Sequence, residues 1–389
     1  MVAVLSGLDV LASRLSSLLR GRTVGLLSHQ ASVTRDLTHA RQAIGAIRGV
    51  KLLRLFAPEH GLSGAAQDLV SVGAERDALT GLPVVSLYGK RLAPEPRALA
   101  GLGALVVDLQ DVGARYYTFV WTMALTMRAA ARVGLPVVVL DRPNPLGGEK
   151  LEGNMPDPRF ASFVGLHPLP TRHGMTIGEL AGYLNDTHGL GCDLTVVPML
   201  GWRRAMLWED TGLPWVAPSP NMPTPDTALV YPGMCLLEGT NLSEGRGTTR
   251  PFELWGAPWL DGGRLAEALA AEKLPGARFR ACAFTPTWDK HRGARCHGVQ
   301  VHVSDARALQ PVRLGAACIV HARAQDPAQF RWRTERYEFV ENLPAIDLLT
   351  GSAEFRTGVT AGRSVGELCA AWDQERDAFA RRRAPFLLY

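Results

Sequence analysis

Five short runs rich in Val and Leu constrain the fold of this chain more than any other feature of its sequence. They are TVGLLS, VKLLRLF, PVVSLY, ALVVDLQ and PVVVLD, at residues 23–28, 50–56, 83–88, 104–110 and 136–141. Nearly continuous apolar runs of this length are typical of strands that are buried on both faces of a parallel sheet. Residues 118–134, between the last two runs, have the composition of a helix. This alternation predicts an α/β fold with a doubly wound, mostly parallel sheet.

The second half of the chain has a different composition. Residues 213–260 are rich in Pro, Gly, Ser and Thr but also in aromatic and apolar residues, which argues for a functional segment and against disorder. After residue 260 we expect one helix and then two strands, at 277–286 and 297–305. The sequence therefore predicts a larger domain at 1–245 and a smaller α+β domain at 246–389.

Two predicted helix starts carry a capping box, which is a Ser or Thr followed three residues later by Glu. Thr176 with Glu179 forms one box, and Ser364 with Glu367 forms the other. In such a box the glutamate accepts a hydrogen bond from a backbone N–H at the start of the helix. We therefore expect both glutamates to be structural and not catalytic.

The overall composition excludes several classes of protein. Hydrophobic residues make up 47% and charged residues 20%, as in a globular protein. The net charge of +5 comes from scattered arginines without interleaved aromatic residues. This disfavours a nucleic-acid partner and fits an acidic small molecule at least as well. No apolar run reaches the ~18–20 residues of a membrane span, and the six cysteines form no close pair, so reduced thiols are expected.

The first 21 residues show a helical pattern and no basic start before an apolar run. They are predicted to belong to the fold and not to a signal peptide. As the sequence stands, this predicts a cytoplasmic protein; the protein would be extracytoplasmic if a leader had been trimmed.

Polar residues follow three of the predicted strands, where each strand ends. In open α/β sheets, ligands bind at the carboxyl ends of the strands. We therefore predict a site at this edge, although for Asp108 and Asp141 a structural role is an equal alternative. The candidate residues are Glu59, His60, Asp108, Gln110, Asp111, Arg115, Asp141, Arg142 and Asn144.

Glu59 is the strongest candidate among these residues. It lies in the stretch LFAPEHGLSG, where Pro58 fixes the backbone before it and Gly61 permits a sharp turn after it. The carboxyl group would therefore be held at the tip of its strand. A glutamate that pairs with a cation or with the loop backbone is the alternative, and His60 is expected to support Glu59.

A second group of polar residues lies in the stretch EGTNLSEGRGTTRPFE, which places Glu238, Asn241, Glu244 and Arg246 close together. These residues supply carboxylates for acid–base chemistry and a cation for an anionic group. A solvated surface loop is the alternative, although the flanking segments are apolar.

The sequence has no dinucleotide or phosphate-loop fingerprint, no H-E-x-x-H and no G-x-S-x-G. Its ten histidines lack the spacing of metal ligands.

Eight motifs occur in an order that resembles one known family across nearly the whole chain. They are FAPEHGLSG, DLQDVGARYYTF, DRPNPLGG, RHGMTIGELA, PSPNMPT, LVYPG, LEGTNLSEGRGTTRPFE and GAPW. Together they resemble the bacterial exo-β-N-acetylmuramidases, once called domain of unknown function 1343. The resemblance implies a Rossmann-like domain and an auxiliary domain with the active site in the cleft between them. It also implies release of N-acetylmuramic acid from the non-reducing ends of peptidoglycan fragments, with no metal or organic cofactor.

The resemblance implies that Glu59 is the catalytic acid, because it is the glutamate of the family's E-H-G motif. Glu244 or Asp111 would be the base or nucleophile, unless the 2-acetamido group of the substrate attacks the anomeric carbon. Arg115 or Arg246 could bind the lactyl carboxylate of muramic acid. The remaining predicted substrate-binding residues are His60, Asp108, Gln110, Asp141, Arg142, Asn144, Asn221 and Asn241.

Two other functions remain open at this stage. One is a sugar-binding protein that keeps the cleft but performs no chemistry. The other is a metal-dependent hydrolase that uses Glu59, His60, Asp108 and Asp111. Turnover separates the enzyme from the binding protein, and sensitivity to a chelator separates the two hydrolases.

Overall fold

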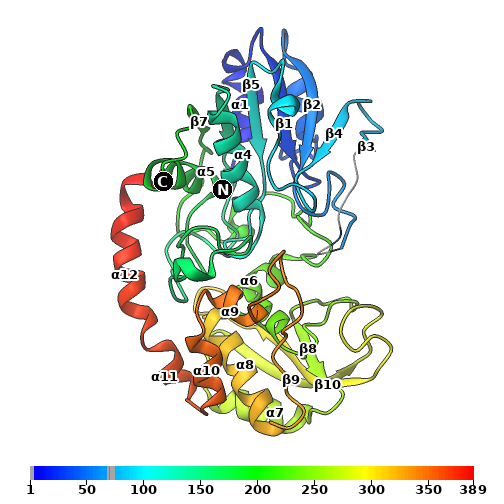
Figure 1. The fold of residues 1–389 in the computed structure, drawn as a ribbon, viewed down its shortest axis with the longest axis vertical. Coiled ribbons are helices and arrows are strands. Elements are labelled where there is room, and N and C mark those ends of the chain that lie inside the picture. Colours follow the sequence, from blue (N-terminus) through cyan, green and yellow to red (C-terminus); the bar gives the residue numbers. More distant parts are fainter. Residues whose placement is uncertain (1–3, 68–69, 71–74) are drawn as a thin grey trace.

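The computed structural model describes residues 4–67, 70 and 75–389. Within them, seven strands form one sheet in the order β3-β4-β2-β1-β5-β6-β7, in which all neighbours are parallel except β3 and β4 (Figure 1). The strands are β1 (Thr23–Ser28), β2 (Lys51–Ala57), β3 (Glu75–Arg76), β4 (Pro83–Ser86), β5 (Ala104–Asp108), β6 (Val137–Leu140) and β7 (Leu194–Val197).

The order of the six parallel strands is that of a Rossmann fold, and it reverses direction between β1 and β5. This confirms the doubly wound parallel sheet predicted from the five apolar runs. The central strand β5 is buried along its whole length. The edge strand β7 is half-exposed and only four residues long, so its sequence lacks a comparable apolar run.

Helices lie on both faces of this sheet in Figure 1. One of them, α5, begins with the predicted capping box, in which Glu179 N donates to Thr176 Oγ1 at 3.3 Å and Thr176 N donates to Glu179 Oε2 at 3.0 Å. Glu179 is therefore structural, as expected. The helices of this half are α1 (Gly7–Ser13), α2 (Ala40–Gly45), α3 (Pro96–Leu99), α4 (Phe119–Ala131) and α5 (Ile177–Thr187). Helix α6 (Pro225–Met234) lies with the other half of the molecule in Figure 1.

The smaller domain contains an antiparallel sheet in the order β8-β10-β9. Its strands are β8 (Leu254–Ala257), β9 (Ala277–Phe284) and β10 (Cys296–Val303), so the two predicted strands are present and β8 lies in the Pro/Gly-rich stretch. Its helices are α7 (Gly262–Ala271), α8 (Pro311–Gln325), α9 (Ala345–Thr350), α10 (Glu354–Thr360), α11 (Val365–Cys369) and α12 (Trp372–Arg383). No described helix is long and apolar enough to cross a membrane.

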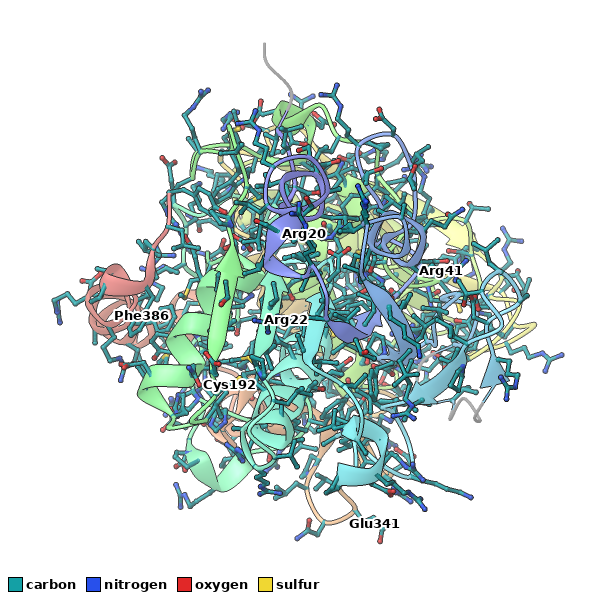
Figure 2. The ribbon with its side chains drawn as sticks, turned by 90° about the horizontal axis from the view of Figure 1, so that it is seen from above. Arg20, Arg22, Arg41, Cys192, Glu341 and Phe386 are labelled. Atoms are coloured by element: carbon teal, nitrogen blue, oxygen red, sulfur yellow. The ribbon has the colours of Figure 1, made fainter. Side chains whose placement is uncertain are left out.

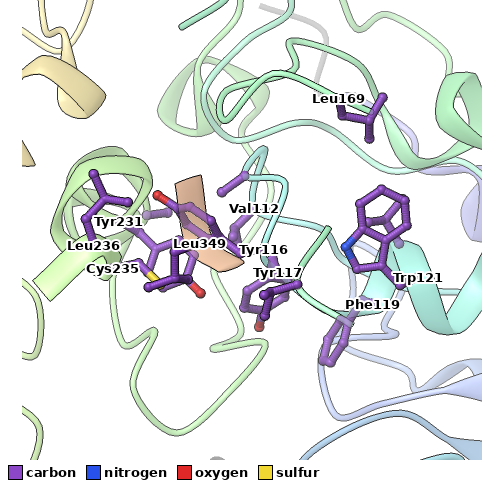
Figure 3. Packing of buried hydrophobic residues seen from close by; sticks show 14 of the residues in the cluster. Val112, Tyr116, Tyr117, Phe119, Trp121, Leu169, Tyr231, Cys235, Leu236 and Leu349 are labelled. Atoms are coloured by element: carbon purple, nitrogen blue, oxygen red, sulfur yellow. The ribbon is translucent and has the colours of Figure 1, made fainter. Parts of the chain in front are cut away.

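Helix α6 packs closely against α8 of the smaller domain. A Cβ atom on Gly233 would lie 1.6 Å from the carbonyl oxygen of Pro311, so only glycine fits at this crossing. Aromatic side chains fill the space beside it, and Figure 3 shows Tyr116 and Tyr117 lying toward Tyr231. The hydrophobic core therefore continues from one domain into the other.

The C-terminal segment returns to the first domain after α12, which runs along the outside of the molecule (Figure 1). Leu388 N donates to Glu179 Oε1 at 2.9 Å, and the Tyr389 hydroxyl donates to Asp141 Oδ2 at 2.7 Å. The boundary between 1–245 and 246–389 stays a prediction, and the last residues of the chain contact the first domain. Figure 2 shows Arg20, Arg22 and Arg41 at separate places around the larger domain.

Candidate active site

Glu59 lies at the carboxyl end of β2, where the chain turns sharply. Strand β2 ends at Ala57, and the two residues after Glu59 have left-handed φ angles, +70° at His60 and +78° at Gly61. The ring of His60 stabilises this turn through a 2.8 Å hydrogen bond between its Nδ1 and the carbonyl oxygen of Ala66. The backbone therefore directs the carboxyl group of Glu59 away from the sheet.

The Glu59 side chain is only 5% exposed. Thr118 Oγ1 donates to Glu59 Oε2 at 2.7 Å. Thr118 is the residue before α4, and its hydroxyl makes no capping bond to that helix. The hydroxyl of Tyr88, which follows β4, also interacts with Glu59. Two hydroxyl groups from different elements thus hold this carboxyl in one orientation.

Glu59 faces a narrow cavity of about 40 Å³ between the two domains. Four predicted site residues, Glu59, His60, Asn221 and Arg246, come together there. Two further carboxyl groups, Glu238 and Glu338, also reach the cavity. The other lining residues are Tyr116, Tyr117, Thr118, Val164, Ser219, Met222, Tyr231, Phe252 and Tyr337.

Arg246 is the cation of this cavity. Its Nη2 donates to Glu238 Oε1 at 2.7 Å, and its Nε donates to Glu244 Oε1 at 3.1 Å. Glu238 also accepts a 2.7 Å hydrogen bond from the hydroxyl of Tyr337. Glu238, which faces the cavity, is therefore held between Arg246 and Tyr337.

Glu244 lies behind Arg246 and does not line the cavity. Its second oxygen accepts a 2.9 Å hydrogen bond from Lys290 Nζ. Burial alone would raise the pKa of Glu244, but the charges of Lys290 and Arg246 lower it below its ordinary value. The prediction that Glu244 is the catalytic base stays untested, but the structure places Glu244 in an ion pair with Arg246 and Lys290, away from the cavity.

Asp111 also lies away from the cavity that Glu59 faces. Its Oδ2 accepts a 2.6 Å hydrogen bond from Gly113 N and lies 3.3 Å from Nε2 of the buried His173. Both contacts hold the loop after β5. The structure therefore does not bring Asp111 together with Glu59, and its predicted role as base or nucleophile stays a prediction.

The crevice between β1 and β5, where Rossmann folds bind ligands, is filled by the chain itself. Arg142 donates from Nε and Nη2 to both oxygens of Asp108, at 2.5 and 2.8 Å, and this ion pair is buried. Gln110 N donates to His29 Nε2 at 3.0 Å. Burial, and then the charge of Arg142, holds the pKa of His29 well below its ordinary value, so the ring is neutral.

Asp108, Gln110 and Arg142 therefore lie away from the cavity of Glu59, and their substrate-binding roles stay predictions. The amide nitrogen of Gln110 donates to the carbonyl oxygens of Asp111 and Pro143, at 2.7 and 2.8 Å. Each of the three predicted side chains therefore holds a loop at the end of β5 or β6.

Asp141, Asn144 and Asn241 are also engaged within the chain. Asp141 accepts hydrogen bonds from Gly178 N at 2.7 Å and from Thr176 Oγ1 at 2.8 Å. Asn144 bonds to the backbone of residues 146 and 175. Asn241 bonds to the backbone of residues 329 and 331. The structure thus does not bring these three residues to the cavity of Glu59, and their substrate contacts stay predictions.

Arg115 is fully buried and connects the two domains. Its Nη1 donates to the carbonyl oxygens of Asn154 and Leu169, and its Nη2 donates to that of Leu349 in α9, each at 2.7 Å. Arg115 does not line the cavity that Glu59 faces, so its predicted contact with the lactyl carboxylate stays a prediction without support from this cavity. Arg246 is the remaining candidate.

The sequence analysis missed Tyr88, Thr118 and Glu338. Glu338 lies 250 residues from Tyr88, and only the fold brings the two together. Thr118 lies within the motif DLQDVGARYYTF, so its membership of that motif could have indicated a role in the site. Glu238 was noticed in its motif but was not assigned a role.

The four residues of the metal-dependent alternative do not come together at one place in the structure. Asp108 binds Arg142, Asp111 lies beside His173, and Glu59 is held by Thr118. Among the described residues, no group of three or more His, Cys, Asp or Glu side chains is arranged to hold a metal ion.

The fold and the site together define a two-domain α/β enzyme with an acidic cavity between its domains. Comparison with known proteins identifies its relatives. Residues 24–226 match the family model for the N-terminal part of the exo-β-N-acetylmuramidase NamZ, and residues 229–389 match the model for its C-terminal part. The chain is 44% identical over 386 residues to the peptidoglycan β-N-acetylmuramidase NamZ of Bacillus subtilis, which covers 99% of this chain and 91% of the relative. The chain therefore belongs to the NamZ exo-β-N-acetylmuramidase family.

Two crystal structures of DUF1343 family proteins from Bacteroides fragilis are similar to the whole chain. One has 33% sequence identity and a TM-score of 0.91, and the match covers 100% of both chains. The other has 28% identity and a TM-score of 0.79, and the match covers 99% of both chains. These similarities confirm the resemblance inferred from the sequence motifs.

Proposed function

We propose that this chain releases N-acetylmuramic acid from the non-reducing ends of peptidoglycan fragments, with Glu59 as the general acid. Membership of the NamZ family supports the reaction. One observation supports the residue: Glu59 is a buried carboxyl, held by a hydroxyl, that faces the cavity between the domains. In such a site a carboxyl group can carry the proton that the departing sugar oxygen needs.

Glu238 is our candidate for the second carboxylate. It faces the same cavity as Glu59, and it accepts a hydrogen bond from Arg246. An ionised carboxylate could act as nucleophile or base, or it could orient the 2-acetamido group of the substrate if that group attacks the anomeric carbon. Glu244 and Asp111 are not proposed for this role because neither residue lines the cavity that Glu59 faces.

Arg246 is our candidate for binding the lactyl carboxylate that distinguishes N-acetylmuramic acid from N-acetylglucosamine. Its side chain lines the cavity, and a guanidinium group has five N–H donors, so it can bind a further oxygen beyond those of Glu238 and Glu244. The cytoplasmic location stays a prediction from the N-terminal sequence.

The test compares wild type with Glu59→Gln on two substrates. One is N-acetylmuramic acid joined to N-acetylglucosamine, whose leaving group needs a proton, and the other is the p-nitrophenyl β-glycoside of N-acetylmuramic acid, whose leaving group needs little help. We expect Glu59→Gln to lose about 10²–10⁴-fold in kcat/KM on the disaccharide and much less on the aryl glycoside. Glu341→Gln, at an exposed position (Figure 2), is the matched control and should keep full activity.

Equal losses on the two substrates would contradict the role of Glu59 as an acid. Absence of turnover by wild type on either substrate would contradict the proposed reaction and favour a sugar-binding protein. Each assay is repeated with EDTA, and full activity in EDTA is the expected result.

A further inference from the structure

The cavity that Glu59 faces is too small for the sugar that the proposed reaction places in it. Its volume is about 40 Å³, whereas cavities that bind small molecules typically have ~300–1,000 Å³. A pyranose ring that carries an acetamido group and a lactyl group therefore cannot enter the cavity as it stands. Part of the cavity wall must move to admit it.

Hydrogen bonds that join the two domains oppose a movement of one whole domain away from the other. Val312 N donates to Glu152 Oε2 at 3.1 Å, and Asp157 N donates to the carbonyl oxygen of Gly351 at 2.9 Å. The buried Arg115 also donates to a carbonyl oxygen of α9 at 2.7 Å. Separating the domains would leave these polar groups without their partners, which is costly for the buried ones.

Residues 334–344 form a different part of the wall, and we call this segment the lid. The structure describes all of them, and they contain no helix or strand. The two ends of the lid are joined, because Ala345 N donates to the carbonyl oxygen of Arg333 at 3.1 Å. Surface loops of this size with adjoining ends are compact units that frequently have a function. The lid contributes Tyr337 and Glu338 to the cavity wall. Its exposed residues are Thr334, Glu335, Arg336, Phe339, Glu341 and Asn342.

The tip of the lid reaches the larger domain. Phe339 packs edge-on against the rings of Tyr88 and Phe163, with 5.3 and 6.1 Å between the ring centroids. The hydroxyl of Tyr88 donates to Glu338 Oε2 at 3.1 Å. Phe163 directly precedes Val164, which lines the cavity from the larger domain. The contacts of the tip therefore close the cavity between the two domains.

The conformation of the tip makes these contacts easier to break than a well-packed interface. Tyr337 and Val340 exchange two backbone hydrogen bonds, of 3.0 and 2.9 Å, around a turn. Both residues of the turn have left-handed φ angles, +43° at Glu338 and +71° at Phe339, which favour Asn and Gly. Phe339 also stays 36% exposed, so its contacts bury only part of its ring. Strain of this kind is found in segments that switch or clamp a ligand.

We propose that residues 334–344 open to admit the substrate and then close over the sugar in the cavity, with Phe339 as the contact that holds the lid shut. The proposal rests on the proposed function, because it takes this cavity as the sugar-binding site. Closure also brings the hydroxyl of Tyr337 to Glu238, to which it donates at 2.7 Å. The lid therefore completes the acidic wall of the cavity and excludes water from it, as lids of other enzymes do.

The first test is hydrogen exchange of backbone amides, measured by mass spectrometry with and without N-acetylmuramic acid. We expect the sugar to slow exchange in peptides from the lid. Phe339→Ala should speed exchange there roughly tenfold without the sugar, because it removes two aromatic contacts. Glu341→Gln, at an exposed position of the same lid, is the matched control and should behave as wild type.

The amides of Asp157 and Val312 report on the domain interface, because their hydrogen bonds join the two domains. Phe339→Ala should leave their exchange unchanged. Faster exchange of these two amides, to the same extent as in the lid, would show that the domains separate and would overturn the proposal. Unchanged exchange of the lid in Phe339→Ala would also overturn it, and neither result requires turnover.

The second test locks the lid shut. In the double variant Phe163→Cys/Phe339→Cys, a short thiol crosslinker that contains a disulfide bond should join the lid to the larger domain. We expect the crosslinked protein to lose most of its kcat/KM on the disaccharide and to regain it when a reductant cleaves the crosslinker. Each single variant, treated with the same reagent, should keep its activity and controls for reaction at the six native cysteines.

Full activity of the crosslinked double variant would overturn the proposal. Absence of turnover by untreated wild type would instead contradict the proposed reaction, and the exchange measurements would still decide whether the lid opens.

Discussion

The two places where this fold could bind a ligand differ in how their charged groups are satisfied. In the crevice between β1 and β5, Asp108 and Arg142 form a buried pair with each other. The cavity between the domains is lined by the carboxyl groups of Glu59, Glu238 and Glu338 and by Arg246, which pairs with Glu238. The first arrangement is a neutral pair, whereas the second has more acids than arginines and lysines among the described residues that line it. The comparison shows that a polar residue at a strand end indicates a site where its side chain reaches a cavity, as Glu59 does, and not where the chain encloses it, as it encloses Asp108.

The largest expected effect on stability comes from breaking the closed crevice. Asp108→Asn would leave the guanidinium of Arg142 buried without its carboxylate. We expect a loss of about 3–5 kcal/mol in the free energy of unfolding, measured by denaturant titration. The turnover rate per folded molecule should stay within about threefold of wild type.

The double variant Asp108→Asn/Arg142→Met is the control for this prediction. It removes both charges and should recover much of the lost stability. A fall in activity of more than a hundredfold in folded Asp108→Asn would place the crevice within the active site and break the comparison.

Two arginines test the comparison between enclosed and cavity-lining residues, because Arg115 is enclosed by the chain and Arg246 lines the cavity. Arg115→Met would leave three buried carbonyl oxygens without a donor, so we expect a loss of roughly 3 kcal/mol in stability. Arg246→Met should instead weaken binding of the muramic substrate and spare its N-acetylglucosamine analogue. The measurements are thermal unfolding and kcat/KM on both sugars for each variant. Equal losses on the two sugars in Arg246→Met would contradict its role in binding the lactyl group.

These pairs also show how much of the molecule can be predicted from sequence. The five apolar runs predict the parallel sheet because each strand needs only local hydrophobic residues. Glu59 can be predicted because Pro58 and Gly61, its near neighbours, set the turn that presents it. The exposure and chemistry of a strand-end residue depend on distant partners, as Arg115 shows by its contact with Leu349.

Glu338 marks the limit of such prediction. Its position in the sequence carries no motif, and its place at the cavity follows from the left-handed turn and from a contact with a residue 250 positions away. Arg142 shows the converse case. Its position at a strand end predicts a binding site, but its guanidinium group is already paired with the carboxylate of Asp108. In both cases the missing information is the long-range pairing of charged groups.

Asp141, at the end of β6, gives a smaller and pH-dependent effect. Burial raises its pKa to about 6, against hydrogen bonds from Tyr389, Gly178 and Thr176 that lower it. A carboxyl group with a raised pKa in the folded state stabilises the fold at low pH, and this stability is lost as the pH rises. We expect a loss of up to about 3 kcal/mol between pH 4 and 6, measured by denaturant unfolding across this range.

Tyr389→Phe sharpens this prediction. It removes a hydrogen bond that favours the ionised form of Asp141, so the loss of stability should move to higher pH. It also leaves Met199 N without its acceptor, which should cost about 1–3 kcal/mol at every pH. An unchanged pH dependence in Tyr389→Phe would show that Asp141 does not control this transition.

The smallest expected effect is the absence of a response to nucleotides. Rossmann folds bind dinucleotides at the crevice between the first and fourth parallel strands, but here the Asp108–Arg142 pair and His29 occupy that crevice. We expect NAD and ADP at millimolar concentration to leave the melting temperature unchanged. N-acetylmuramic acid should instead raise the stability by about 2.7 kcal/mol at a hundred times its Kd, and Arg246→Met should reduce this gain. A nucleotide-induced rise in melting temperature that is kept in Glu59→Gln and lost in Asp108→Asn would show that the crevice binds ligands. The crevice and the cavity would then both be binding sites, and they would differ only in the ligand that they bind.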